Sequence, residues 1–169
     1  MRIALIAPIL WLIAQEEYLA SLCLFLLASL SDGLDGFLAK RFDWQTRLGA
    51  LLDPVADKLL VASVFAMLVV ADLIPLWLAS IVILRDVLIV GGATAYNFLI
   101  RPLEGEPTRI SKLNTALELL LILFVLSRAA VGWPPDVSVT VLGAGVLVTV
   151  VVSGIDYVLS WSRRAREKV

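Results

Sequence analysis

The sequence has no histidine and only one cysteine, Cys23, and both shortages restrict its chemistry. Histidine is the commonest general base and the commonest metal ligand in proteins, so this chain must use other groups for both roles. A single cysteine excludes an intrachain disulfide, and Cys23 lies in an apolar run, where it is best interpreted as a small hydrophobic residue. Acid–base chemistry therefore falls to carboxylates, lysine or tyrosine.

Charge is also sparse, because 17% of the 169 residues are charged and 60% are hydrophobic. The mean hydropathy is +0.95, and apolar runs recur along the whole length. Soluble domains hold about half apolar residues and place them on one face of each helix, so this pattern predicts a polytopic membrane protein. No linker or internal repeat interrupts residues 1–169, which indicates a single domain.

Six apolar segments predict an all-α integral membrane protein with six transmembrane helices. They span about residues 3–15, 18–39, 49–72, 75–99, 111–131 and 138–161, and Pro and Gly fall mainly in the breaks between them. Basic residues gather on one side of this topology: Arg2, Lys40, Arg41, Arg47, Arg101, Arg109, Lys112, Arg163, Arg164, Arg166 and Lys168. The positive-inside rule then places both termini in the cytoplasm.

Four aspartates lie near the cytoplasmic ends of two of these segments. Asp32 and Asp35 are three residues apart, and Asp53 and Asp57 are four apart, so each pair shares one face of its helix. Carboxylates that converge at membrane depth repel one another unless divalent cations balance them. Oxygen ligands without His or Cys favour Mg²⁺, Mn²⁺ or Ca²⁺ over zinc. Two other interpretations stay open. The aspartates could be solvated carboxylates at helix ends that pair with Lys40, Arg41 and Lys58, or they could form a cation transport or channel site.

Small residues accompany the acids at fixed positions. Gly36 follows Asp35, Ala39 lies one turn further on, and Gly49 lies one turn before Asp53. Small side chains at these positions allow either close packing of two helices or the approach of a flat ligand. A small cation transporter or channel would not require them in register with the acids, so the combination favours an enzyme.

The combined pattern is Asp-x-x-Asp-Gly-x-x-Ala-(basic)-x8-Gly-x3-Asp-x3-Asp, running from Asp32 to Asp57. It resembles the signature of the CDP-alcohol phosphotransferase family, which implies a membrane-embedded fold of six helices. Where the family usually has Arg, this chain has Lys40, which keeps the charge but lacks the bidentate fork. Family members also commonly have a stretch before a residue like Arg2, so we expect the natural chain to begin earlier.

The resemblance implies an enzyme of phospholipid biosynthesis that works at the cytoplasmic face, releases CMP and forms a homodimer among membrane lipids. Its donor would be CDP-diacylglycerol, and no nucleic acid partner is expected. The resemblance assigns two divalent cations, Mg²⁺ or Mn²⁺, to four carboxylates: Asp32, Asp35, Asp53 and Asp57. It makes Asp57 the general base as well. It assigns the cytidine and the diphosphate of the donor to four further residues: Gly36, Ala39, Gly49 and Lys40.

Two basic residues are candidates for binding the acceptor. Arg85 lies midway through the fourth segment and Lys112 opens the fifth, and together they predict an anion pocket for an acceptor phosphate. Arg85 has an alternative partner in the neighbouring Asp86 or another intramembrane acid, and Glu118 is as well interpreted as a structural partner for a basic residue. The stretch LLDPVADKLL resembles the phosphatidylglycerophosphate synthase and cardiolipin synthase branch, so the expected acceptor is glycerol 3-phosphate or phosphatidylglycerol. Asn114 stands where the first group often has a second Lys, which favours phosphatidylglycerol.

Overall fold

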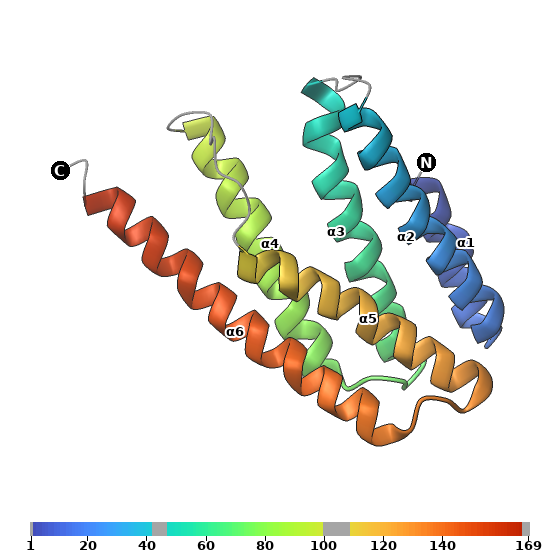
Figure 1. Ribbon diagram of the computed structural model, residues 1–169. Helices are drawn as coiled ribbons and strands as arrows, with labels where there is room; N and C mark the ends of the chain where they lie inside the picture. The colour runs from blue at the N-terminus through green and yellow to red at the C-terminus, as the bar shows by residue number, and fades with distance from the viewer. Residues whose placement is uncertain (1, 42–46, 100–108, 167–169) are drawn as a thin grey trace.

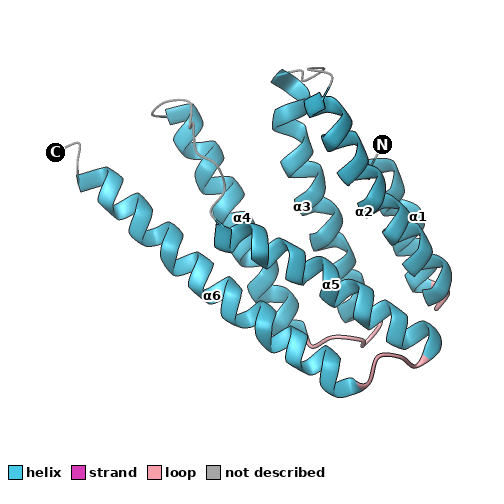
Figure 2. Cartoon of the chain, in the orientation of Figure 1, coloured by secondary structure: helices cyan, strands magenta, loops and turns pink. Residues whose placement is uncertain are grey.

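The computed structural model describes the backbone of residues 2–41, 47–99 and 109–166, and the side chains of residues 4–31, 56–89, 91 and 110–154. The described backbone forms helices and turns without a strand (Figure 2), which confirms the predicted all-α class. The helices are α1 (Arg2–Ala14), α2 (Tyr18–Arg41), α3 (Arg47–Val70), α4 (Leu76–Leu99), α5 (Arg109–Val131) and α6 (Asp136–Arg166). Each corresponds to one of the apolar segments expected from the sequence.

Tight turns end three of the helices where the sequence places acidic residues, Gly or Pro. Glu16 and Asp72 adopt left-handed backbone conformations, with φ of 60° and 55°, and Gly132 has a φ of 73°. The N–H of Glu17 donates to the carbonyl of Leu12 at 2.9 Å, which closes the last turn of α1 in the usual manner of a left-handed cap. These three turns lie along the lower side of Figure 1, whereas the start of α1 and the end of α6 lie toward the upper side.

The helices pack around an apolar core to which all six contribute. α5 packs against α2, α3 and α6, while α1 packs against α2 and α3, and α4 packs against α3 and α6. The core includes Ile9, Phe25, Phe65, Val82, Leu121 and Val146, each at most 1% exposed. The core residues that α5 contributes lie on one face of that helix, as the 3.6-residue period requires. Among the described side chains, this core lies in the half of the helix assembly nearest the three tight turns.

Apolar side chains also cover much of the outer surface. Trp11, Leu27, Leu84, Leu88 and Val148 are each 60–64% exposed, on four different helices. Exposed apolar surface on this scale marks contact with a membrane or with another protein. Among the described residues, Ile110–Val131 and Asp136–Gly154 are long and apolar enough to cross a membrane by length and composition. The six transmembrane spans remain a prediction from the sequence.

Candidate active site

The acidic motif is carried by α2 and α3, on either side of their connection. Asp32 and Asp35 belong to α2, and Asp53 and Asp57 belong to α3. The side chains of the first three lie outside the described residues, as do those of the residues assigned to the nucleotide: Gly36, Ala39, Lys40 and Gly49. The convergence of the four carboxylates therefore stays a prediction. Asp57 is described and half-buried, and it precedes Lys58 at the middle of α3.

The side chain of Lys58 on α3 forms ion pairs with residues of α4 and α5. Its ammonium Nζ donates to both carboxylate oxygens of Asp86 on α4, at 2.7 and 2.8 Å. The same nitrogen lies 3.4 Å from the hydroxyl of Thr115 on α5 and 3.7 Å from Oε2 of Glu118, also on α5. The two charge-assisted hydrogen bonds to Asp86 belong to the stronger class of hydrogen bonds in proteins. Lys58 thus bridges carboxylates that two other helices contribute.

Arg85 lies on the other side of Asp86 and is buried. Its Nη1 donates to Oδ1 of Asp86 at 2.7 Å, so Asp86 is shared by two cations. Its Nη2 donates to the hydroxyls of Ser111 on α5 and Ser153 on α6, at 3.1 and 2.6 Å. The third nitrogen, Nε, is buried and has no hydrogen-bond partner within the described part of the chain. Arg85 therefore retains a donor that an anion or a water molecule can use.

Glu118 is fully buried, and hydrogen bonds from residues of α5 and α6 orient its side chain. Its Oε1 accepts a hydrogen bond from Nδ2 of Asn114, one turn earlier on α5. The Oδ1 of Asn114 in turn accepts a hydrogen bond of 2.8 Å from the hydroxyl of Thr149 on α6. The second carboxylate oxygen of Glu118, Oε2, has no hydrogen-bond partner among the described residues. It forms an ion pair with the ammonium group of Lys58.

These contacts form one buried polar network that joins α3, α4, α5 and α6. It consists of Lys58, Arg85, Asp86, Ser111, Asn114, Thr115, Glu118, Thr149 and Ser153. Two basic and two acidic side chains are matched in number, as is usual for buried ionisable groups. On α5 the inward face changes from polar residues at 111–118 to apolar residues at 121–126. The network therefore replaces the apolar core in the half of the assembly that leads toward the acidic motif.

A family model for CDP-alcohol phosphatidyltransferases matches residues 1–152 of the chain. The chain belongs to this family. It is 36% identical to the CDP-diacylglycerol–glycerol-3-phosphate 3-phosphatidyltransferase of Aquifex aeolicus over 167 residues, which cover 94% of this chain and 89% of that protein. It is 32% identical to the human CMP-forming cardiolipin synthase over 169 residues, covering 90% of this chain and 56% of that protein.

A third relative, the cardiolipin synthase and mitochondrial hydrolase fusion protein of Schizosaccharomyces pombe, is 35% identical over 156 residues. That match covers 83% of this chain but 26% of the relative, so the chain spans only part of its fission yeast and human relatives. Both kinds of synthase are similar to this member of the CDP-alcohol phosphatidyltransferase family at comparable identity. The comparisons therefore identify the family without separating the two acceptors.

Of the two residues predicted to bind the acceptor, Arg85 lies inside the network and Lys112 does not. Arg85 is 5% exposed and pairs with Asp86, the alternative partner that the sequence offered. Lys112 is exposed on α5, directly after the buried Ser111. The joint role of Arg85 and Lys112 toward an acceptor phosphate stays a prediction.

The sequence offered Glu118 as a structural partner for a basic residue, and its ion pair with Lys58 confirms this. Sequence reasoning did not identify the rest of the α5 side of the network, although a signal for it was present. Ser111, Asn114, Thr115 and Glu118 recur at the i, i+3, i+4 and i+7 positions of an otherwise apolar helix. Polar residues at that spacing share one helix face, and in an apolar helix such a face turns inward toward other polar groups. Lys58 was noted only as a possible ion-pair partner for nearby carboxylates, whereas it bridges two helices.

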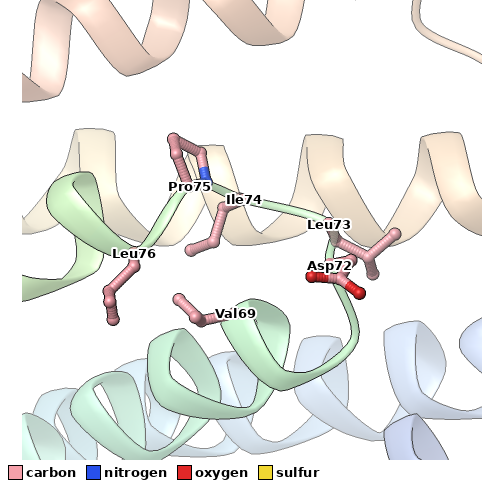
Figure 3. Close-up of a pocket in the computed structure, with 6 residues that line it drawn as sticks. All are labelled: Val69, Asp72, Leu73, Ile74, Pro75 and Leu76. Carbon is pink, nitrogen blue, oxygen red and sulfur yellow. The ribbon is translucent and has the colours of Figure 1, made fainter.

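A separate hollow of about 410 Å³ lies at the turn between α3 and α4. Val69, Asp72, Leu73, Ile74, Pro75 and Leu76 line it, and Asp72 is the one charged residue among them (Figure 3). Lys58 lies fourteen residues before Asp72, which corresponds to about 20 Å along a helix at 1.5 Å per residue. The hollow is therefore remote from the polar network and takes no part in the candidate active site.

Proposed function

We propose that the chain transfers the phosphatidyl group of CDP-diacylglycerol to a hydroxyl of a glycerol-type acceptor and releases CMP. The observation that carries this proposal is the family match over residues 1–152, which contains the unbroken motif from Asp32 to Asp57. The Aquifex aeolicus relative is named for glycerol 3-phosphate, and the human relative is named a CMP-forming cardiolipin synthase. The proposed acceptors are accordingly glycerol 3-phosphate and phosphatidylglycerol.

The motif suits two Mg²⁺ or Mn²⁺ ions by the chemistry of its donors. Asp32 and Asp35 on α2, and Asp53 and Asp57 on α3, offer carboxylate oxygens alone, and the chain has no histidine. Hard divalent cations prefer such donors. Lys58, which follows Asp57, has acidic partners on two other helices, Asp86 on α4 and Glu118 on α5. When bound, the ions would offset the charge of the diphosphate and make the attacked phosphorus more electrophilic.

Asp57 is the proposed general base. A carboxylate within hydrogen-bond reach of the acceptor hydroxyl accepts its proton while the hydroxyl oxygen attacks the phosphorus of the phosphatidyl group. The new phosphorus–oxygen bond forms as the bond from that phosphorus to the phosphate oxygen of CMP breaks, and CMP leaves with the electron pair. Gly36, Ala39 and Gly49 would leave room for the cytidine, and Lys40 would meet the diphosphate. No Ser, Thr or Cys nucleophile is required.

The acceptor phosphate is proposed to bind at Arg85 and Lys112. The guanidinium group has five N–H donors, of which the contacts to Asp86, Ser111 and Ser153 use three. The buried Nε has no acceptor among the described residues, so a phosphate oxygen there would satisfy it. Both acceptors carry a phosphate near a free hydroxyl, and the proposal therefore applies to either.

The proposed setting is a membrane crossed six times, with both termini and the acidic motif at the cytoplasmic face. The three described turns share one side of the molecule and the outer ends of α1 and α6 point to the other, which supports an even number of crossings (Figure 1). Basic residues concentrate on that second side in the sequence. A lipid donor would keep its tails in the leaflet and present its diphosphate to the motif. A homodimer is proposed from the family resemblance alone.

The decisive experiment is an assay of CMP release from CDP-diacylglycerol by the purified protein in detergent, with each acceptor added in turn. We expect CMP only when Mg²⁺ or Mn²⁺ and one of the two acceptors are present, with the product identified by mass spectrometry. Asp57→Asn serves as the matched control, because it keeps the shape of the side chain and removes the base. A folded wild-type protein that releases no CMP with either acceptor would refute the proposed function.

A further inference from the structure

We propose that Lys58 and Glu118 form a positioning pair for Asp57: Glu118 on α5 and Asp86 on α4 hold the Lys58 ammonium from two sides and fix the turn of α3 that carries Asp57. The inference rests on the proposed function only for the role of Asp57. The arrangement that carries it is the placement of one ammonium between two carboxylates, 2.7 Å from Asp86 and 3.7 Å from Glu118.

Lys58 is held more firmly than a lysine at a helix surface. Its ammonium contacts both oxygens of Asp86 and lies within 3.4 Å of Thr115, and its side chain is 20% exposed. Lysine normally keeps many side-chain rotamers in water, and ordering them costs free energy. Here the partners come from α4 and α5, so α3 cannot rotate about its axis without breaking contacts to both helices.

Glu118 supplies the part of this arrangement that packing alone does not explain. Its side chain is fully buried, one oxygen is fixed by Asn114, and the other has no hydrogen bond within the described residues. Exchanging buried ionic groups for well-packed hydrophobic residues is often neutral or stabilising, so stability gives little reason to keep this carboxylate. Its Oε2 faces Lys58, and Lys58 is the only cation with which Glu118 forms an ion pair in the described part of the chain.

The constraint reaches Asp57 through the backbone. Successive residues of an α-helix are related by a fixed rotation of about 100°, so a Lys58 that is fixed in direction also fixes the direction in which the preceding residue leaves the helix. A displacement of about 1 Å at a reacting group can cost about a hundredfold in rate. Side chains that orient metal ligands commonly contribute about 10- to 100-fold in metal affinity or activity. Glu118 and Lys58 are therefore positioning residues, since they act through Asp57 and not on the substrate.

The test compares Glu118→Gln, Lys58→Gln, the double variant and Lys58→Arg. Gln at 118 can still accept the hydrogen bond of Asn114, but its amide would face Lys58 without a negative charge. We expect each Gln variant to lower kcat and weaken Mn²⁺ binding about 10- to 100-fold, with both substrate KM values nearly unchanged. If Glu118 acts through Lys58, the double variant should be no worse than Lys58→Gln, and Lys58→Arg should retain most of the metal affinity.

Manganese binding is measured by electron paramagnetic resonance on the purified protein without substrate, so this readout does not depend on phosphatidyl transfer. Ser21→Ala is the matched control, because Ser21 is also fully buried, its hydroxyl has no hydrogen-bond partner among the described residues, and it lies on α2 outside the network. It should leave both readouts unchanged. Multiplicative losses in the double variant, or wild-type Mn²⁺ affinity in Lys58→Gln, would overturn the positioning role. If Glu118→Gln fails to fold, equal Mn²⁺ affinities in Lys58→Gln and Lys58→Arg would also overturn it.

Normal Mn²⁺ binding by a wild-type protein that releases no CMP would refute the proposed function and leave the positioning pair standing. Loss of Mn²⁺ binding in the Gln variants would still support the pair in that case. The two ideas can therefore fail separately.

Discussion

Asp86 is the anion that two cations share, and its removal should destabilise the protein more than removal of Arg85. Asp86→Ala leaves Arg85 and Lys58, whose side chains are 4% and 20% exposed, with Glu118 as the nearest remaining charge. Breaking a buried pair in this way costs about 3–5 kcal/mol. Arg85→Ala leaves Asp86 bound to Lys58 through both oxygens, so its loss should be nearer about 1.5–3 kcal/mol, the value of a hydrogen bond to a charged group.

Thermal unfolding in detergent can resolve this order. A change of 1 kcal/mol shifts Tm by about 2–4 °C for a chain of this size, so Asp86→Ala should melt several degrees below Arg85→Ala. The double variant should be less destabilised than the sum of the single variants, with a coupling energy of about 0.5–3 kcal/mol. An Arg85→Ala variant that melts below Asp86→Ala, or single effects that simply add, would refute the shared-anion reasoning.

Four further outcomes test the candidate active site. Removal of divalent cations with EDTA should abolish CMP release, and added Mg²⁺ should restore it; full turnover in metal-free buffer would contradict the metal proposal. Asp57→Asn should lower kcat about 10²–10⁴-fold with donor binding largely kept; near wild-type turnover would remove Asp57 as the base. Gly36→Leu and Gly49→Leu should raise the KM for CDP-diacylglycerol at normal folded yield, whereas an unchanged KM would limit these glycines to helix packing. Lys112→Ala should raise the acceptor KM without lowering Tm, because its side chain is exposed, whereas Arg85→Ala should change both; stable variants with unchanged acceptor KM would exclude the phosphate pocket.

The helices could be predicted from the sequence because their ends have local causes. The fourth apolar segment, expected at about 75–99, is α4 from Leu76 to Leu99, and its start follows Pro75. Proline fixes its own φ and favours a helix that begins just after it. The expected sixth segment, about 138–161, is shorter than α6, which runs from Asp136 to Arg166. The last residues of α6 include several that are charged, and hydropathy alone does not show that a helix continues through them.

The polar network could be predicted only in part. The sequence offered Asp86 as a partner for Arg85, because the two are neighbours, and that pairing is present. The partners Ser111 and Ser153 lie 26 and 68 residues away in the chain. Such contacts depend on the rotation of α5 and α6 about their axes, which the apolar pattern leaves undetermined within each helix. The acidic motif, by contrast, was recognisable from spacing because all of its members lie within one stretch from Asp32 to Asp57.

The position of the buried charges on α3 relates the polar network to the acidic motif. Among the described side chains, the apolar core lies near the three tight turns, and well-packed apolar side chains would serve equally well at the level of Lys58 if stability were the only requirement. The chain instead places two basic and two acidic side chains there, and one of them, Lys58, directly follows the half-buried Asp57 in the sequence. Ionisable groups inside membrane helices are expensive, and they are commonly retained where they serve function. We therefore expect the buried charges to serve the chemistry proposed for the acidic motif, and a variant that made this level wholly apolar would be expected to remain folded and lose activity.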